Sequence, residues 1–298
     1  MTDKGSPKPY KRSVLPLAGQ VAVVTGGGRG MCKGIALELA DAGADIAIIE
    51  TDTLDSPYNH YGTKDIQGFR FAQQVAEEIK RLDRRAIAVK CDVSHYDEVK
   101  TAIEQIIKEM GKINIWVNGA GVQSMSGIPT TEIVDEAWDL VYAVNVKAHM
   151  YTAKALIPYF KEQGGGKFIN VASAGGHVTG VLDKMATYCS SKGAAIIFAH
   201  CLALEVADYN IRVNVICPGG TGPTQMAFPE ANVEGKPIPT PILEDYSEEK
   251  KKEIYDSIPY GLLSKFVSPR DIGRLAVYLA STDTVTGVTM TCDNFSMW

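Results

Sequence analysis

The stretch that decides the fold is VAVVTGGGRGMCKGIALELADAGADIAIIE, residues 21–50. It opens with a β-branched run at 21–25 and passes directly into Gly26-Gly27-Gly28-Arg29-Gly30. Apolar residues then recur with helical spacing over 31–42, and a second apolar run follows at 46–50. This order predicts a strand, a tight glycine turn, a helix and a second strand.

The same alternation continues along the rest of the chain. Further apolar runs typical of strands lie at 86–90, 113–118, 167–173, 211–217 and 288–292. Stretches of helical period separate them, at 67–81, 96–110, 131–163, 186–209 and 269–281. Strands that are apolar on both faces belong to a parallel sheet with helices on each side. We therefore predict an α/β fold: one doubly wound domain at 16–298 with a mostly parallel seven-stranded sheet, preceded by a flexible tail at 1–15.

Composition narrows the function classes before any motif is considered. Apolar residues make up 45% of the 298 residues and charged residues 22%, which is ordinary for a folded globular chain. A net charge of −5 argues against nucleic acid or an anionic membrane as the main partner and favours a small molecule. The six cysteines have no CxxC spacing, so we expect reduced thiols, no metal site and a cytoplasmic protein. Neither a secretory signal nor a run of about 18 apolar residues is recognised, so no membrane association is expected.

Two segments interrupt the alternation of strands and helices. Residues 51–64 lie between the second strand and its helix, and residues 219–260 form a long Pro-rich stretch before the last helix. Loops of this length are uncommon without a task. The second follows the carboxyl end of a strand, where open α/β sheets bind ligands, so we predict a substrate loop there. We expect the first to be a surface insertion.

The glycine turn and Glu50 together indicate a nucleotide site. Glycines let the backbone approach a pyrophosphate, whose charge the start of the following helix stabilises, although glycines alone also suit an ordinary turn. Glu50 closes the second strand 20 residues after Gly30, where a carboxylate accepts hydrogen bonds from ribose hydroxyls and repels a 2′-phosphate. We therefore predict NAD in preference to NADP. Arg29 argues the other way, because a guanidinium in the turn can contact a phosphate.

A tyrosine and a lysine at the start of an alanine-rich helix indicate proton-transfer chemistry. Tyr188 and Lys192 are four residues apart, so both side chains project from one face of the helix. A phenol is a poor base at neutral pH, and a neighbouring ammonium lowers its pKa by favouring the phenolate. Ser173 ends the preceding strand and brings a hydroxyl to the same edge of the sheet.

These pieces, taken in order, resemble the short-chain dehydrogenase/reductase family over about residues 17–293. The matching motifs are Thr25-Gly26-x-x-x-Gly30, Asp92-Val93, Asn118-Gly119-Ala120-Gly121, Asn145, Ser173, Tyr188-x-x-x-Lys192 and Pro218-Gly219. Each motif is weak alone, and their joint occurrence makes the resemblance specific. The resemblance implies a Rossmann-like fold and an oxidoreductase that moves a hydride between a nicotinamide and a secondary alcohol or ketone.

The resemblance also implies roles for individual residues. Tyr188 is expected to be the general acid/base, Lys192 to lower its pKa and hold the nicotinamide ribose, and Ser173 to orient the substrate oxygen. Asn145 is expected to hold a water in the proton relay. Expected cofactor contacts are Gly26, Arg29, Gly30, Met31, Glu50, Asp92, Val93, Asn118, Gly119, Ala120, Tyr188, Lys192, Pro218, Gly219 and Thr221. Family members pair through long helices like those predicted here, so a homodimer or homotetramer is expected.

Three positions depart from the family pattern. Cys32 stands where a third glycine is usual, and we interpret it as an inert packing thiol. Ser173 and Tyr188 are 15 residues apart, about two more than expected, so the loop 174–187 is predicted to bulge at the substrate pocket. The residues 221–224 after Pro218-Gly219 do not match, which leaves their contacts with the cofactor open.

Other interpretations stay open or are set aside. A hydrolase triad of Ser173, His177 and Asp183 lacks the expected elbow motif, and Cys91, Asp92 and His95 are too close in sequence to converge on a metal. His177 is a possible substrate contact, and His149 is interpreted as structural. Loop residues Met125, Met185, Met226 and Phe228 suggest a hydrophobic, cyclic substrate, although core packing explains them equally well. The rival function is a catalytically retired nucleotide-binding regulator on the same fold; a sugar-nucleotide epimerase is less favoured.

Overall fold

The computed structural model describes residues 15–178, 182–222, 247, 249 and 267–294. Most of the predicted N-terminal tail and of the predicted substrate loop lie outside the described residues, as do Met226 and Phe228.

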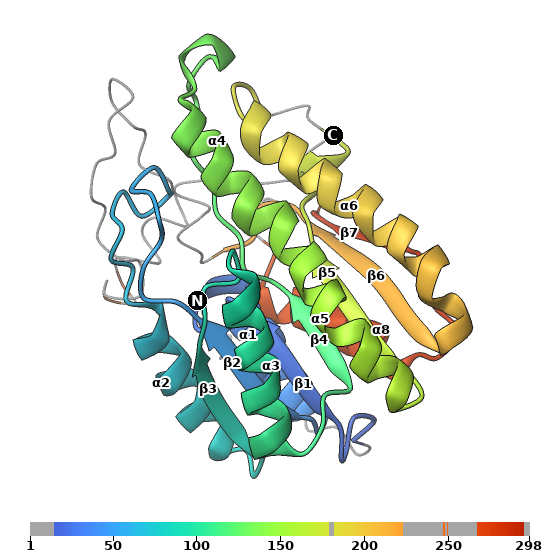
Figure 1. Cartoon of the computed structure of the whole chain (residues 1–298). Helices are drawn as coiled ribbons and strands as arrows, with labels where there is room; N and C mark the ends of the chain where they lie inside the picture. The colour runs from blue at the N-terminus through green and yellow to red at the C-terminus, as the bar shows by residue number, and fades with distance from the viewer. Residues whose placement is uncertain (1–14, 179–181, 223–246, 248, 250–266, 295–298) are drawn as a thin grey trace, which may run out of the picture.

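The seven predicted strands form one sheet in the order β3-β2-β1-β4-β5-β6-β7, and every pairing between neighbours is parallel (Figure 1). The strands are β1 (Val21–Thr25), β2 (Asp45–Glu50), β3 (Ala86–Lys90), β4 (Ile115–Asn118), β5 (Gly166–Val171), β6 (Ile211–Pro218) and β7 (Thr289–Cys292). The order reverses between β1 and β4, which creates the crevice where doubly wound sheets bind ligands. The predicted fold is confirmed.

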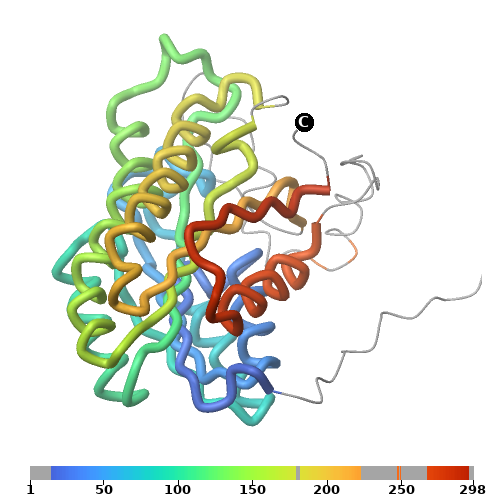
Figure 2. The backbone as a smooth tube through the Cα atoms, turned by 90° about the vertical axis from the view of Figure 1, so that its right-hand side faces the viewer, coloured from blue at the N-terminus to red at the C-terminus, as the bar shows by residue number. Residues whose placement is uncertain are grey.

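Helices cover both faces of the sheet. One face carries α1 (Gly30–Asp41), α2 (Gly68–Lys80) and α8 (Pro269–Ser281). The other carries α3 (Tyr96–Met110), α4 (Asp135–Tyr142), α5 (Ala148–Glu162) and α6 (Ala186–Val206). Figure 2 shows the two layers edge-on, with blue and red helices on one side of the sheet and green to orange helices on the other. Buried aliphatic side chains fill the space between sheet and helices on each face, as expected for strands that are apolar on both sides.

The single helix predicted over 131–163 is wrong in one respect that bears on the site. A 3₁₀ turn (Thr130–Glu132) precedes α4, and a π-helical turn (Ala143–Lys147) separates α4 from α5. The side chain of Asn145 leaves this turn to bond the backbone of Val122, a contact that no local pattern reveals. Such π-turns occur often at functional sites.

The helix that carries Tyr188 and Lys192 is unusually apolar. Together with the 3₁₀ turn that follows it, the segment Ala186–Tyr209 is long and apolar enough to cross a membrane by length and composition alone. Its inner face packs on β5 and β6, and Ala195, Ala199 and Ala203 are buried there. Packing on the sheet therefore accounts for the apolar residues of the inner face, whereas Ile197 and Leu204 on the other face are exposed.

Candidate active site

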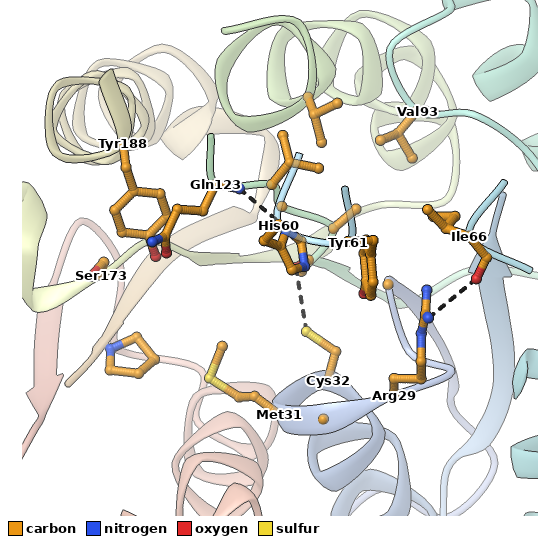
Figure 3. Close-up of a pocket in the computed structure, with 18 of the residues that line it drawn as sticks. Arg29, Met31, Cys32, His60, Tyr61, Ile66, Val93, Gln123, Ser173 and Tyr188 are labelled. Atoms are coloured by element: carbon orange, nitrogen blue, oxygen red, sulfur yellow. Dashed lines mark hydrogen bonds between the residues drawn. The ribbon is translucent and has the colours of Figure 1, made fainter. Parts of the chain in front are cut away.

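A cavity of about 440 Å³ lies along the carboxyl edge of the sheet. Its wall combines the glycine turn after β1, residues at or just beyond the ends of β2 to β6, and the first turn of α6. Figure 3 places Tyr188 and Ser173 at one end of the cavity and Arg29 and Ile66 at the other. The cavity therefore joins the predicted catalytic end to the predicted cofactor end.

The glycine turn has the geometry that close approach to a phosphate requires. Gly26 has a φ of +71°, and a Cβ there would lie 2.9 Å from the Cα of Ala120, so only glycine fits. No side chain of the described residues caps the first turn of α1, and that turn carries no acidic residue. The N–H groups in the first turn of a helix have no partner within that helix, and at this helix start they suit the pyrophosphate of a dinucleotide.

Glu50 lies where the sequence predicted, at the end of β2 and in the cavity wall. Its carboxylate Oε1 accepts a hydrogen bond from the Gly28 N–H at 3.1 Å, and the residue is 9% exposed. This bond fixes the carboxylate beside the glycine turn. A fixed acid at this place suits the ribose hydroxyls of adenosine.

Arg29 is held between aromatic rings. Its guanidinium carbon lies 4.5 Å from the centre of the Tyr61 ring and 4.9 Å from that of Phe71. Its Nη1 donates to the carbonyl of Ile66 at 3.2 Å (Figure 3). Cation–π contacts on both rings and this hydrogen bond tie the guanidinium to the segment that follows β2.

That segment is not a surface insertion, and our prediction for residues 51–64 is wrong. Leu54, His60, Tyr61 and Ile66 line the cavity. The ring nitrogen Nδ1 of His60 accepts a hydrogen bond from the Gln123 N–H at 3.4 Å, which fastens the segment to the far side of the crevice. The segment thus forms part of the wall around the predicted adenosine end.

A signal for this arrangement was present in the sequence. Leu54, Tyr58, Tyr61 and Ile66 are apolar or aromatic residues in a loop that follows the carboxyl end of a strand. A loop at that edge that is rich in such residues favours a ligand site over a solvated insertion. Burial of His60 in this segment lowers its pKa to about 3, with a further contribution from the Arg29 charge, so the ring stays neutral.

Ser173 and Tyr188 meet at the catalytic end of the cavity. Ser173 caps the 3₁₀ turn Ala174–Gly176, and its Oγ accepts from the Gly175 N–H at 3.1 Å. Burial raises the pKa of the Tyr188 phenol to about 12, and the side-chain hydrogen bond with Ser173 acts in the opposite direction. We expected the Lys192 ammonium to lower this pKa; in the structure burial outweighs any such effect.

Lys192 and Asn145 stand directly behind this end of the cavity. Lys192 is 4% exposed, and its Nζ donates to the carbonyl of Val171 at 3.1 Å. Its Nζ lies 5.8 Å from the centre of the Tyr188 ring. Burial lowers the pKa of Lys192 to about 8. The ammonium therefore sits close to its own titration point at physiological pH.

The side chain of Asn145 is fully engaged by protein atoms. Its Oδ1 accepts from the Val122 N–H at 2.8 Å, and its Nδ2 donates to the Val122 carbonyl at 2.9 Å and to Ser191 Oγ at 3.0 Å. The amide thus anchors the loop after β4 to the π-turn and to α6. The resemblance implies a relay water at Asn145. Because the side-chain amide is already bonded, such a water would have to bind the backbone carbonyl of Asn145.

The remaining predicted site residues fall into two groups. Those that line the cavity are Gly26, Arg29, Gly30, Met31, Glu50, Asp92, Val93, Gly119, Ala120, Ser173, Tyr188, Pro218, Gly219 and Thr221. Asn118, Asn145 and Lys192 lie behind its wall, and the amide of Asn118 joins β4 to β5 by donating to Asn170 Oδ1 at 2.8 Å. Sequence reasoning missed Gln123, Leu182 and the segment after β2, all of which contribute to the wall.

Several weighed side chains lie elsewhere or serve packing. Met185 lines the cavity, whereas Met125 is buried outside its wall. His177 contacts Thr291, with Nε2 at 3.3 Å from Oγ1. The Cys32 thiol donates to the Gly119 carbonyl at 3.4 Å, and burial raises its pKa to about 12, which agrees with an inert packing role. Among the described residues, no group of histidine, cysteine and acidic side chains has the arrangement of a metal site.

Comparisons with known proteins agree with this geometry. The model of a family described as short chain dehydrogenase matches residues 20–233. The hydroxynaphthalene reductase-like protein Arp2 from Metarhizium acridum is 32% identical over 269 residues, which cover 90% of each chain. A cyclohexanol dehydrogenase from Rhodococcus sp. (strain TK6) is 28% identical over 283 residues, which cover 94% of this chain and 96% of that protein.

A solved structure shows the same arrangement. The 3-ketoacyl-(acyl-carrier-protein) reductase from Brucella melitensis, complexed with NADH, superposes with a TM-score of 0.72. The two chains are 28% identical, and the match covers 95% of this chain and 100% of the other. The similarity in sequence and in fold to known proteins thus extends along nearly the whole chain.

Proposed function

Because the chain belongs to the short-chain dehydrogenase/reductase family, we propose that it is an NAD-dependent oxidoreductase acting on a hydrophobic, cyclic secondary alcohol or its ketone. The observation that carries this proposal is the single cavity that holds the glycine turn and Glu50 at one end and Ser173 and Tyr188 at the other. A dinucleotide bound by the glycine turn and Glu50 would extend along this cavity, so its nicotinamide would lie beside a substrate oxygen held by Ser173 and Tyr188. The bound nicotinamide supplies or accepts the hydride.

The residues of the chain handle the proton. With its pKa raised, Tyr188 keeps its proton at neutral pH, the state needed to protonate the oxygen of a ketone as it becomes an alcohol. The Ser173 hydroxyl, bonded to Tyr188, orients that oxygen. Lys192 places a positive charge behind the phenol and stabilises the phenolate that remains. Alcohol oxidation needs the phenolate, so it is expected to accelerate as the pH rises.

Two side chains support NAD in preference to NADP. Glu50 is fixed beside the glycine turn, where a carboxylate repels a 2′-phosphate. Arg29, which argued for a phosphate contact, is committed to the rings of Tyr61 and Phe71 and to the Ile66 carbonyl. The NADH in the Brucella melitensis structure is consistent with this choice.

The wall at the catalytic end supports a hydrophobic substrate. Met31, Val144, Leu182 and Met185 contribute apolar surface there, and Gln123 contributes an amide. Two relatives bear names that refer to ring compounds, a hydroxynaphthalene reductase-like protein and a cyclohexanol dehydrogenase. A cyclic alcohol or ketone fits both the lining and these names.

The proposal extends to the form of the protein. We expect a single catalytic domain over 16–298, located in the cytoplasm and assembled as a homodimer or homotetramer. Large apolar side chains are exposed on the outer surfaces of α4, α5 and α6, namely Trp138, Met150, Ile197 and Leu204. A second copy that covers them would bury this surface.

The proposal is tested by a substrate screen. The purified protein is incubated with NAD or NADP and a panel of cyclic, aromatic and polyol alcohols, and the absorbance of the reduced nicotinamide is followed. We expect turnover of a cyclic alcohol with NAD. Exclusive turnover of a polyol contradicts the hydrophobic pocket, and tight NAD binding without turnover of any alcohol or ketone favours the retired regulator.

A further inference from the structure

A buried histidine next to the catalytic end has no role in the mechanism so far. His149 is 2% exposed and lies at the start of α5, four residues beyond Asn145. Neither of its ring nitrogens has a hydrogen-bond partner among the residues that the structure describes. An imidazole buried in this way is costly unless something bonds it.

A second unpartnered group lies in the same layer between the sheet and α5. Asn170 in β5 is 1% exposed, and its Nδ2 has no partner within the described ranges. Its side chain points to the same face of the sheet as Phe168, two residues earlier, because side chains alternate along a strand. Phe168 packs in the cluster that contains Leu156 and Phe160 of α5. Asn170 therefore faces the helix that carries His149.

Lys192 is bonded to the strand that carries Asn170. Its Nζ bonds the carbonyl of Val171, the residue that follows Asn170. A Cβ built on Gly121 would lie 3.2 Å from this Nζ and 3.4 Å from Asn145 Oδ1. Both polar atoms are therefore close to Gly121. His149 stands one helical turn beyond Asn145. The buried polar side chains of His149, Asn170 and Lys192, from α5, β5 and α6, thus belong to one region behind the cavity, and the Lys192 charge is near enough to His149 to act on its pKa.

The charges in this region leave His149 as a neutral acceptor. Burial and, to a smaller extent, the Lys192 ammonium together lower the pKa of His149 to about 3. The other groups that face Lys192 are Tyr188 on its own helix and the thiols of Cys32 and Cys217, whose pKa values burial raises to about 12. A neutral ring has one nitrogen that accepts a hydrogen bond.

We propose that His149 is a positioning residue for Lys192: its imidazole and the Asn170 amide hold one internal water that accepts a hydrogen bond from the lysine ammonium. The water accepts from Lys192 Nζ and Asn170 Nδ2 and donates to the unprotonated nitrogen of His149. Three hydrogen bonds are the usual number for a buried water. The inference rests on the proposed function, because it assigns His149 to the charge that stabilises the Tyr188 phenolate.

The consequence concerns the protonation of Lys192. A group that accepts from an ammonium favours its charged form and raises its pKa. Without His149, the pKa of Lys192 is therefore expected to be lower than in the wild type. Ketone reduction needs the charged lysine, so its alkaline limit is expected to move to lower pH.

The test compares H149L, which removes the acceptor, with H149N, which keeps a polar side chain. The assay is the reduction of cyclohexanone with NADH, with kcat measured as a function of pH. In H149L we expect the alkaline loss of kcat to occur about one pH unit lower than in the wild type. In H149N we expect it to return toward the wild-type pH. The control is T152V, since Thr152 is buried on the same helix and its Oγ1 bonds only the local Ala148 carbonyl among the described residues. Its profile is expected to match that of the wild type.

A second readout does not depend on turnover. The Nζ resonance of Lys192 in lysine-¹⁵N-labelled protein, assigned by its loss in K192M, reports the pKa of the ammonium directly. We expect this pKa to be lower in H149L than in the wild type, and H149M serves in the same way if H149L does not fold.

The outcomes separate the inference from the proposed function. An unchanged Lys192 titration in both apolar variants overturns the role of His149, even when the enzyme reduces ketones. A shifted titration in a protein that turns over no ketone supports the role of His149 and contradicts the proposed function. Equal thermal shifts in H149L and H149N without any change in titration identify a purely structural histidine.

Discussion

At the scale of single residues, Glu50 carries the choice of cofactor. It is fixed by the Gly28 N–H and is 9% exposed, so its charge is poorly screened by solvent. In E50A we expect NAD to bind about ten-fold more weakly and NADP to become a usable cofactor, because the repulsion of the 2′-phosphate is lost. The ratio of kcat/KM values for the two cofactors measures this change.

E50Q separates charge from hydrogen bonding. Its amide oxygen is able to accept from Gly28, but the negative charge is gone. If E50Q admits NADP as E50A does, the charge sets the preference. A wild-type protein that already prefers NADP in a side-by-side assay contradicts our argument from Glu50.

The ease of predicting a residue depended on how local its signal was. Tyr188, Lys192 and Glu50 were found because their spacing from a turn or from each other is fixed within one helix or one strand-turn-helix unit. The protonation of Tyr188 was not found, because the desolvation that raises its pKa comes from residues distant in the sequence. The ring nitrogens of His149, which have no partner in the described part of the chain, are likewise visible only once the helix is packed on the sheet.

At the scale of elements, the segment after β2 is expected to stabilise bound cofactor. Tyr61 stacks on Arg29 at 4.5 Å and lines the cavity. In Y61A we expect loss of roughly 1 kcal/mol of cation–π stabilisation, hence about a five-fold rise in the Kd for NAD. K64A, an exposed position in the same segment, is the matched control. Isothermal titration with NAD measures both, and equal affinities for wild type and Y61A exclude a role for this contact.

Elements were predicted well where the pattern was local. The bounds of all seven strands agree with the apolar runs to within two residues. The stretch 131–163 failed at its π-turn, where Asn145 makes a tertiary contact with Val122, 23 residues earlier in the chain, that local periodicity does not reveal. The prediction for the segment 51–64 was wrong because local sequence does not tell an insertion that folds back over a cavity from one that extends into solvent. The two differ mainly in tertiary contacts.

At the scale of the whole molecule, two neutral buried histidines make stability sensitive to acid. Burial lowers the pKa values of His60 and His149 from the usual 6.5 of a histidine to about 3. Between these values the unfolded chain binds protons that the native state does not, so stability is complete above about pH 6.5 and falls as the pH drops toward 3. At pH 5 the two histidines together lower the free energy of unfolding by roughly 4 kcal/mol relative to pH 7.

Denaturant unfolding at pH 7 and at pH 5 measures this loss. H149L removes one of the two groups, so the difference between the two pH values is expected to shrink by about half. A difference that stays the same in H149L shows that His149 does not bind a proton on unfolding in this range.

The proposed reaction depends on Tyr188 as the proton donor and acceptor. The most direct test is single-turnover kinetics of Y188F with NAD and the best alcohol of the screen, beside Y142F as a control, since the Tyr142 hydroxyl bonds Ser190 away from the cavity at 3.0 Å. We predict that Y188F binds NAD like the wild type and that its hydride transfer is slower by about 10² to 10⁴-fold, whereas Y142F is unaffected. Hydride transfer at the wild-type rate in Y188F would contradict the mechanism.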